Sequence, residues 1–119
     1  MKTTTRLISL LAAALLSAGA HAADVMKKDG VLVNSAGMTV YTFDKDSAGQ
    51  SACNGPCSEN WPAVTPSAGV AAPYAAITRE DGAKQLTYNG KPLYTFKKDV
   101  KPGDRNGDNF KDIWHVVKD

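Results

Sequence analysis

The chain has 119 residues, of which 43% are hydrophobic and 22% are charged, and its formal net charge is +2. Residues 1–22 contain two basic and no acidic side chains, so the remaining 97 residues (119 minus 22) carry 12 basic and 12 acidic groups. A neutral chain of this kind lacks the basic face that contacts with phosphate groups require, so we expect no binding to nucleic acid. Its length fits one domain that buries about two-thirds of its unfolded surface.

The beginning of the chain has the features of a secretory signal peptide. A positively charged start is followed by an apolar run at residues 7–16, which is too short to span a bilayer. Ala20 and Ala22 are the small residues that precede a cleavage site, so we expect residues 1–22 to be removed before Ala23. No later segment is long and apolar enough to span a membrane. The sequence therefore predicts a periplasmic or secreted protein.

A ten-residue segment occurs twice, 53 positions apart: residues 37–46 read GMTVYTFDKD and residues 90–99 read GKPLYTFKKD. An internal repeat of this kind indicates one supersecondary unit used twice. We expect repeat one (about 31–64) and repeat two (about 75–117) to share one core in a single β domain over residues 23–119. The motif residues that return at this offset are Tyr41, Phe43, Asp46 and Trp61 in the first copy and Tyr94, Phe96, Asp99 and Trp114 in the second.

Turn residues divide the chain into short strands. Asp81-Gly82 and Asn89-Gly90 supply the positive φ angles that two-residue hairpin turns require. Residues 58–61 are expected to form at most one helical turn, and residues 67–73 to connect the repeats. The predicted fold is mainly β, a small antiparallel β domain built from two pseudo-symmetric repeats. Its expected strands cover 31–33, 38–43, 75–79, 85–88, 93–96 and 113–117.

We interpret the repeated aromatic and acidic residues as structural. Tyrosine and tryptophan combine a large apolar body with one polar tip, which suits the edge of a small core. Asp46 and Asp99 each follow a predicted strand, where a carboxylate accepts backbone N–H groups and fixes a loop. A folding device has to be present in both halves, whereas a catalytic site does not.

Cys53 and Cys57 occur in one repeat only. In an oxidising compartment a disulfide is the default, and the Gly-Pro pair between them bends the chain toward bonding range. The open alternatives are a redox-active pair and a soft-metal site. Three residues separate the cysteines, not the two of a thioredoxin motif, and no helix clearly follows. We expect a structural disulfide and no bound metal; the weak further candidates for a metal ligand are His115, Met26 and Met38.

Other chemical signatures are weak or missing. Residues 104–112 resemble a calcium loop, but the glycine falls at position 4 where an EF-hand needs it at position 6, so Asn106-Gly107 favours a plain turn. The chain has no Gly-x-Ser-x-Gly, no phosphate-binding glycine loop and no His-Glu-x-x-His. We therefore expect neither a cofactor nor enzymatic activity.

The motifs together resemble the exported and lipoprotein family with a repeated Tyr-x-aromatic-x-x-Asp motif, described as a secreted repeat of unknown function. Residues 41–46 and 94–99 both fit this motif, and the resemblance covers about residues 31–117. It implies an envelope protein and brings no activity or catalytic residues. Many members carry a lipobox cysteine, which this chain lacks. Further matching segments are Ser51 to Pro62, Asp81 to Gln85, Gly90 to Tyr94 and Pro102 through Gly107 to Trp114.

The function that best fits these observations is a non-enzymatic binding or interaction module of the envelope, with an unknown ligand or protein as its partner. The alternative is a periplasmic metal- or redox-handling protein that uses Cys53 and Cys57. A small hydrolase, which would have to use His115, ranks third.

Overall fold

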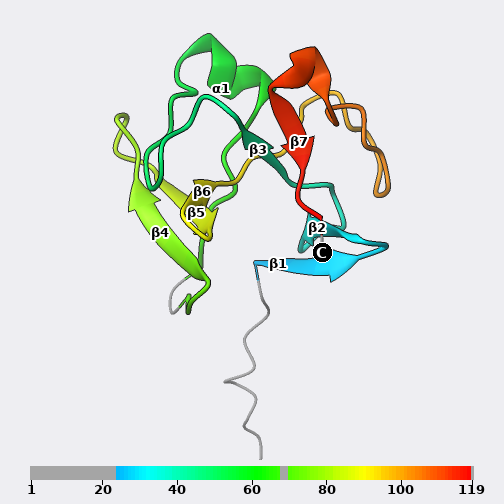
Figure 1. Cartoon of the computed structure of the whole chain (residues 1–119), viewed down its shortest axis with the longest axis horizontal. Coiled ribbons are helices and arrows are strands. Elements are labelled where there is room, and N and C mark those ends of the chain that lie inside the picture. Colours follow the sequence, from blue (N-terminus) through cyan, green and yellow to red (C-terminus); the bar gives the residue numbers. More distant parts are fainter. Residues whose placement is uncertain (1–23, 68–69, 119) are drawn as a thin grey trace, which may run out of the picture.

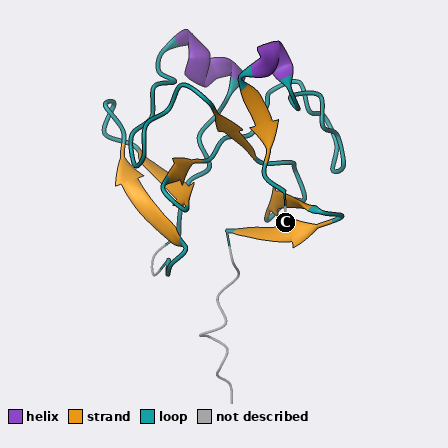
Figure 2. Cartoon of the chain, viewed as in Figure 1, coloured by secondary structure: helices purple, strands orange, loops and turns teal. Residues whose placement is uncertain are grey.

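The computed structural model describes residues 24–67 and 70–118 (Figure 1), so the predicted signal peptide lies outside the described residues. The described chain is mainly β, as the sequence predicts, and its short antiparallel strands are joined by turns (Figure 2). The elements in chain order are β1 (Val25–Lys28), β2 (Val31–Asn34), β3 (Tyr41–Phe43), α1 (Pro56–Asn60), β4 (Tyr74–Thr78), β5 (Lys84–Tyr88), β6 (Lys91–Pro92), the 3-10 helix η2 (Phe110–Asp112) and β7 (Trp114–Val116).

The strands form three small sheets, β1-β2, β4-β5-β6 and β3-β7. Asn89-Gly90 makes the predicted two-residue turn between β5 and β6, and both residues have positive φ angles (51° and 83°). Asp29-Gly30 makes the same kind of turn between β1 and β2, a hairpin that the sequence analysis did not predict. The β3-β7 pair joins a strand of repeat one to a strand of repeat two.

Four local predictions were wrong in detail. The expected strand over 93–96 is absent from the described structure: β6 ends at Pro92, and Tyr94 makes only isolated bridges, to Tyr41 and Ala63. Leu93 N–H still follows the register of β5 and β6 and donates to Leu86 O (3.0 Å). Thr95 N–H donates to Pro62 O instead (2.8 Å), so the chain beyond Leu93 leaves β5.

The same cause shortens β3, since the amide of Val40 donates to Leu32 O (3.0 Å) and the strand begins only at Tyr41. The helical turn expected at 58–61 begins earlier, because Pro56 occupies a first-turn position where its missing N–H costs nothing. The β4-β5 turn also differs: Arg79 N–H donates to Ala83 O (2.8 Å), so its loop holds three residues, 80–82, instead of Asp81-Gly82 alone.

The core consists of two clusters of buried residues, and each cluster draws on both repeats. One cluster holds the repeated aromatic residues with Val31, Val33, Cys53 and Val116; the other holds Val25, Leu32, Val40, Val64, Leu86 and Leu93. The hairpins β1-β2 and β4-β5 lie on opposite lower sides of the molecule, and the helical turns α1 and η2 lie at the same upper end (Figure 1). This arrangement places equivalent parts of the two repeats around one central axis.

Candidate functional site

The centre of the molecule is a reciprocal contact between the two repeats. Tyr41 and Tyr94 exchange both backbone hydrogen bonds, with N–O distances of 2.7 and 2.9 Å. Each hydroxyl then donates to the aspartate of the other repeat, Tyr41 to Asp99 Oδ2 (2.6 Å) and Tyr94 to Asp46 Oδ2 (2.7 Å). A pseudo-twofold axis therefore passes between the two tyrosines, and these backbone and tyrosine–aspartate contacts come in symmetric pairs across it.

Both aspartates also hold the loop that follows them. Asp46 accepts the Ala52 amide at 2.6 Å, and Asp99 accepts the Asn106 amide at 2.9 Å. Burial raises the pKa of the Tyr94 hydroxyl to about 12, and its hydrogen bond to Asp46 acts in the same direction. Burial raises the pKa of Tyr41 as well, assisted by Asp99. These hydroxyls stay protonated at neutral pH and act as hydrogen-bond donors.

A four-ring aromatic stack crosses the same axis. The rings follow the order Phe43, Trp114, Trp61, Phe96, so the repeats alternate along the stack. Successive centroids are 4.1, 3.7 and 4.0 Å apart, and the two tryptophan planes are within 2° of parallel. Gly107 lies so close that a Cβ there would be 2.8 Å from the Trp61 ring, so this turn requires glycine.

A groove of about 310 Å³ lies over this stack, and we call it the axial groove. Its walls include residues of α1 and η2, the two helical turns at the upper end in Figure 1. Eight of its lining residues form four pairs at the 53-residue offset, so the groove itself is pseudo-symmetric. The pairs are Phe43 and Phe96, Cys57 and Phe110, Asn60 and Ile113, and Trp61 and Trp114, and the two further lining residues are Lys98 and Lys111.

The groove is apolar with a positive rim. Five of its ten lining residues are aromatic, and none of the ten, all in the described part of the chain, is acidic. The Nζ of Lys111 lies 5.7 Å from the centroid of the Phe110 ring, while Lys98 contributes the second ammonium group. Such a site can hold a flat or apolar body together with an anionic group.

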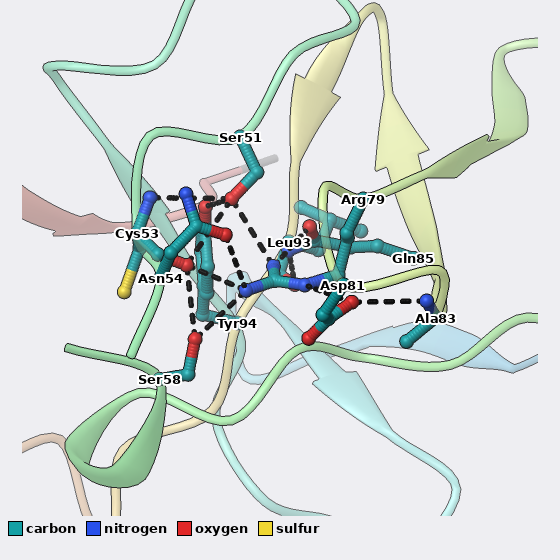
Figure 3. A network of polar contacts seen from close by, with 10 residues as sticks. All are labelled: Ser51, Cys53, Asn54, Ser58, Arg79, Asp81, Ala83, Gln85, Leu93 and Tyr94. Carbon is teal, nitrogen blue, oxygen red and sulfur yellow. Dashed lines mark hydrogen bonds and ion pairs between the residues drawn. The ribbon is translucent and has the colours of Figure 1, made fainter. Parts of the chain in front are cut away.

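The symmetry is broken at one corner of the molecule, where Arg79 is buried (Figure 3). Its side chain is 2% exposed, and its guanidinium donates to Ser51 Oγ (3.1 Å), Gln85 Oε1 (2.6 Å), Cys53 O (2.5 Å) and Ser58 Oγ (2.8 Å). Among the described residues, its one carboxylate within ion-pair distance is that of Asp81, 3.8 Å from Nε and 61% exposed. A buried cation is thus held mainly by neutral acceptors.

A chain of hydrogen bonds connects this cation to the centre of the molecule. Ser51 Oγ accepts from Arg79 and lies 2.6 Å from the Tyr94 hydroxyl, which donates to Asp46. Because Tyr94 uses its proton on Asp46, Ser51 donates to Tyr94. The chain therefore runs in one direction from a guanidinium to a carboxylate, an arrangement in which each bond polarises the next. Burial raises the pKa of Asp46.

Repeat one contains no counterpart of Arg79. The β1-β2 turn has two residues, Asp29-Gly30, whereas the β4-β5 connection spans residues 79–83 and carries the arginine. The sequence places Arg79 at the end of the expected strand 75–79 and does not predict its burial, because arginine is rarely buried. The signal that could have pointed to Arg79 is the turn between β4 and β5, which is longer than the turn between β1 and β2.

Cys53 and Cys57 form the expected disulfide, with an S–S distance of 2.05 Å and a Cα–Cα distance of 5.2 Å. The two sulfur-bearing residues differ in environment. Cys53 is completely buried beneath the Arg79 network, whereas Cys57 is half-buried and lines the axial groove. The structure therefore joins the asymmetric corner to the groove through this bridge.

The remaining metal candidates belong to different elements: His115 to β7, Met26 to β1, and Met38 to the loop between β2 and β3. His115 is hydrogen-bonded through Nε2 to Asp44 (2.8 Å) and through Nδ1 to Asn109 (3.1 Å). Met26 is an exposed residue of β1. Within residues 24–67 and 70–118, no three His, Cys, Asp or Glu side chains are grouped so that they would hold a metal ion.

The segment that resembles a calcium loop is held by its own backbone. Asp104 accepts the amides of Val100 (2.8 Å) and Lys101 (3.1 Å), and these bonds lower the pKa of its carboxyl. Asp108 accepts the Val116 amide at 3.2 Å. Asn106 and Gly107 occupy the middle of a turn closed by Asp108 N–H and Arg105 O.

A family model described as a secreted repeat of unknown function matches the chain twice, at residues 24–65 and 75–118. The first match begins earlier than the predicted repeat one and so includes β1. No curated protein and no solved structure matches the chain. None of the helices in the described segments has the length and apolar character needed to cross a membrane.

Proposed function

The chain belongs to the family of secreted repeats of unknown function, and we propose that it is a non-enzymatic binding module of the cell envelope, periplasmic or secreted, whose ligand occupies the axial groove. The observation that carries this proposal is the groove itself. Ligand sites are typically concave, largely pre-formed and lined by aromatic residues with few polar groups. A volume of about 310 Å³ suits a small molecule or one side chain of a larger partner.

The groove is built on the buried aromatic cluster at the centre of the molecule. Its floor is the four-ring stack, whose members are fixed by near-parallel contacts and by the Tyr–Asp pairs below them. A ligand that binds there pays little for ordering the protein, which favours affinity. The chemistry of the lining selects a ligand with an aromatic or apolar body and an acidic group that meets Lys98 or Lys111.

The distribution of titratable groups supports binding over catalysis. The side chains with raised pKa values at the centre, Tyr41, Tyr94 and Asp46, are committed to hydrogen bonds inside the fold and do not line the groove. The groove lining itself offers ammonium groups, one amide and a disulfide sulfur. These groups suit the binding of a ligand better than general acid–base catalysis, which needs a proton donor or acceptor positioned at the reacting atoms.

The test uses the fluorescent aromatic anion anilinonaphthalene sulfonate, titrated against the folded protein. We expect saturable binding at one site, weakened about three- to fivefold by Lys98→Gln and by Lys111→Gln, and weakened further by high salt. Lys45→Gln is the matched control, because Lys45 is the 53-residue mate of Lys98 and does not line the groove. Equal losses in all three variants, with near-ultraviolet circular dichroism unchanged, would contradict the proposal.

A further inference from the structure

We propose that the Cys53–Cys57 disulfide is a thiol–disulfide exchange site, in which Cys57 receives an incoming thiol and Cys53 leaves as a thiolate beside Arg79. This inference goes beyond ligand binding in the axial groove and does not require it. It rests on three observations of the described structure: the unequal burial of the two cysteines, the buried cation at Cys53, and the absence of cysteine from the equivalent turn of repeat two.

The burial of the cysteines decides which sulfur an external thiol can reach. Cys53 has no exposed surface, whereas Cys57 is half-buried and lines the groove. Thiol–disulfide exchange proceeds by attack of a thiolate on one sulfur while the other departs, so access selects the sulfur attacked. A thiol that approaches through the groove meets Cys57, and Cys53 is the leaving group.

A thiolate at a buried position needs a compensating charge. Arg79 supplies one, because its guanidinium donates to the carbonyl of Cys53 itself and to the side chains of Ser51 and Ser58 around it. In Figure 3 the Cys53 sulfur lies on the opposite side of that residue from the guanidinium, so the arginine would act through its field and not by a direct bond. A nearby cation stabilises a thiolate and makes it a better leaving group.

Repeat two has no bridge at the equivalent position. In repeat two the equivalent wall of the groove is η2, and Phe110 stands where repeat one has Cys57. Asn106 likewise stands at the 53-residue offset from Cys53. Repeat two thus builds its wall of the groove without cysteines, from a 3-10 turn with left-handed residues where repeat one has the α-helical turn α1. The short loop between Cys53 and Cys57 restricts the unfolded chain only slightly. The bridge is therefore free to serve chemistry.

The exchange balances with a dithiol, or a pair of thiols, as co-reactant. A thiolate of the co-reactant attacks Cys57 Sγ, the Cys53–Cys57 S–S bond breaks, and its electron pair goes to Cys53 Sγ. The second thiol then attacks the mixed disulfide at the co-reactant's sulfur and releases Cys57. The co-reactant loses two electrons and two protons and becomes a disulfide, and both cysteines end as thiols.

The first experiment maps the site of attack. The folded, oxidised protein is incubated with reduced glutathione, quenched with acid and iodoacetamide, and analysed by peptide mass spectrometry. We expect the glutathione adduct on Cys57 and the alkylated thiol on Cys53, with at least about a tenfold preference. Adducts divided equally between the cysteines, or a folded protein whose bridge resists excess dithiothreitol, would overturn the proposal.

The second experiment tests whether loss of the Arg79 side chain slows or speeds the reduction of the disulfide. The rate of reduction by dithiothreitol at neutral pH should fall about tenfold in Arg79→Gln and stay within about threefold of the parent in Arg79→Lys, which keeps the charge. A merely structural arginine predicts the opposite, since its loss would loosen the loop and speed reduction. Arg105→Gln, which removes an exposed arginine that donates to Asp29 O, is the control and should leave the rate unchanged. If Arg79→Gln does not fold, the rate at which dithiothreitol reduces Arg79→Lys and the position of the glutathione adduct still test the proposal.

Discussion

The symmetric centre of this protein and its asymmetric corner are built in different ways. In the centre, each tyrosine, aspartate and stacked ring of one repeat contacts its counterparts in the other, and both copies are required for either to be complete. In the corner, Arg79 and the Cys53–Cys57 bridge occur once, and repeat two forms a 3-10 turn at the position of α1 without them. Duplicated residues build the core and most of the axial groove above it, whereas the residues that occur once form the exchange site that we propose.

The two corners of the repeats also differ in what their tyrosine touches. The Tyr41 hydroxyl accepts the Gly107 amide at 3.1 Å, whereas the Tyr94 hydroxyl lies 2.6 Å from Ser51 Oγ and so connects to Arg79. The Gly107 N–H that donates to the Tyr41 hydroxyl is replaced at Tyr94 by the Ser51 hydroxyl, which is hydrogen-bonded to Arg79. The corner is therefore attached to the centre through Tyr94, and this connection can be broken selectively.

The largest effect is expected from cutting the stack at either tryptophan. Trp61 and Trp114 are both almost completely buried and face each other at 3.7 Å, so Trp61→Ala and Trp114→Ala should each lower the free energy of unfolding by about 3–5 kcal/mol. The two losses should agree within about 1 kcal/mol, because the residues are symmetry mates. Urea unfolding followed by circular dichroism measures both.

Met26→Ala is the control for this experiment, since Met26 is 53% exposed on β1 and its loss should change stability by less than about 0.5 kcal/mol. If one substitution lowered the free energy of unfolding several times more than the other, the two repeats would contribute unequally to stability despite their symmetric geometry.

The next effect concerns alkaline pH and compares the two tyrosines with the rest of the fold. Burial raises the pKa of Tyr94 to about 12, above its ordinary value of about 10. The folded state therefore holds this proton more tightly than the unfolded state. Its contribution is complete below about pH 10 and is lost as the pH rises toward about 12, a change of about 2–3 kcal/mol.

Tyr41 acts in the same direction, because burial and Asp99 raise its pKa too. The free energy of unfolding should thus fall steeply between about pH 10 and 12, and the double variant Tyr41→Phe with Tyr94→Phe should fall less steeply over that range. The measurement is denaturant unfolding at a series of pH values. Equal slopes in the parent and the double variant would mean that the two hydroxyls are not the groups that hold the proton.

The centre was largely predictable from the sequence, because a 53-residue offset that keeps tyrosine, aspartate and tryptophan indicates equivalent places in one core. The exchange of partners was not predicted. Tyr41 lies five positions before Asp46, and proximity in the sequence would pair these two. The crossed pairing depends on the contact between Tyr41 and Tyr94, which are 53 positions apart, and no local pattern indicates it.

The corner was less predictable for physical reasons. The disulfide followed from the expected compartment and the short spacing, but nothing in the local pattern distinguishes a buried arginine from an exposed one at the end of a strand. Arg79 is fixed by acceptors far from it in sequence, such as the carbonyl of Cys53, 26 positions earlier. The axial groove was unpredictable for the same reason, since its walls α1 and η2 come from different repeats and are far apart in the sequence.

The smallest effect sharpens the comparison between the turn with a bridge and the turn without one. Cys53→Ala combined with Cys57→Ala should lower the free energy of unfolding by about 2 kcal/mol at most, because the bridge closes a short loop and so constrains the unfolded chain weakly. The native turn should persist, because backbone bonds from residue 57 to Asn54 O and from Ser58 to Gly55 O close it without the sulfur atoms. Arg79 also keeps its acceptors at Ser51 Oγ and at the carbonyl of residue 53. Urea unfolding, together with the near-ultraviolet signal of the stacked tryptophans, checks both statements. A loss well above 2 kcal/mol, or a collapsed tryptophan signal, would show that the bridge carries structure that repeat two obtains in another way, and the division between a structural centre and a functional corner would then be wrong.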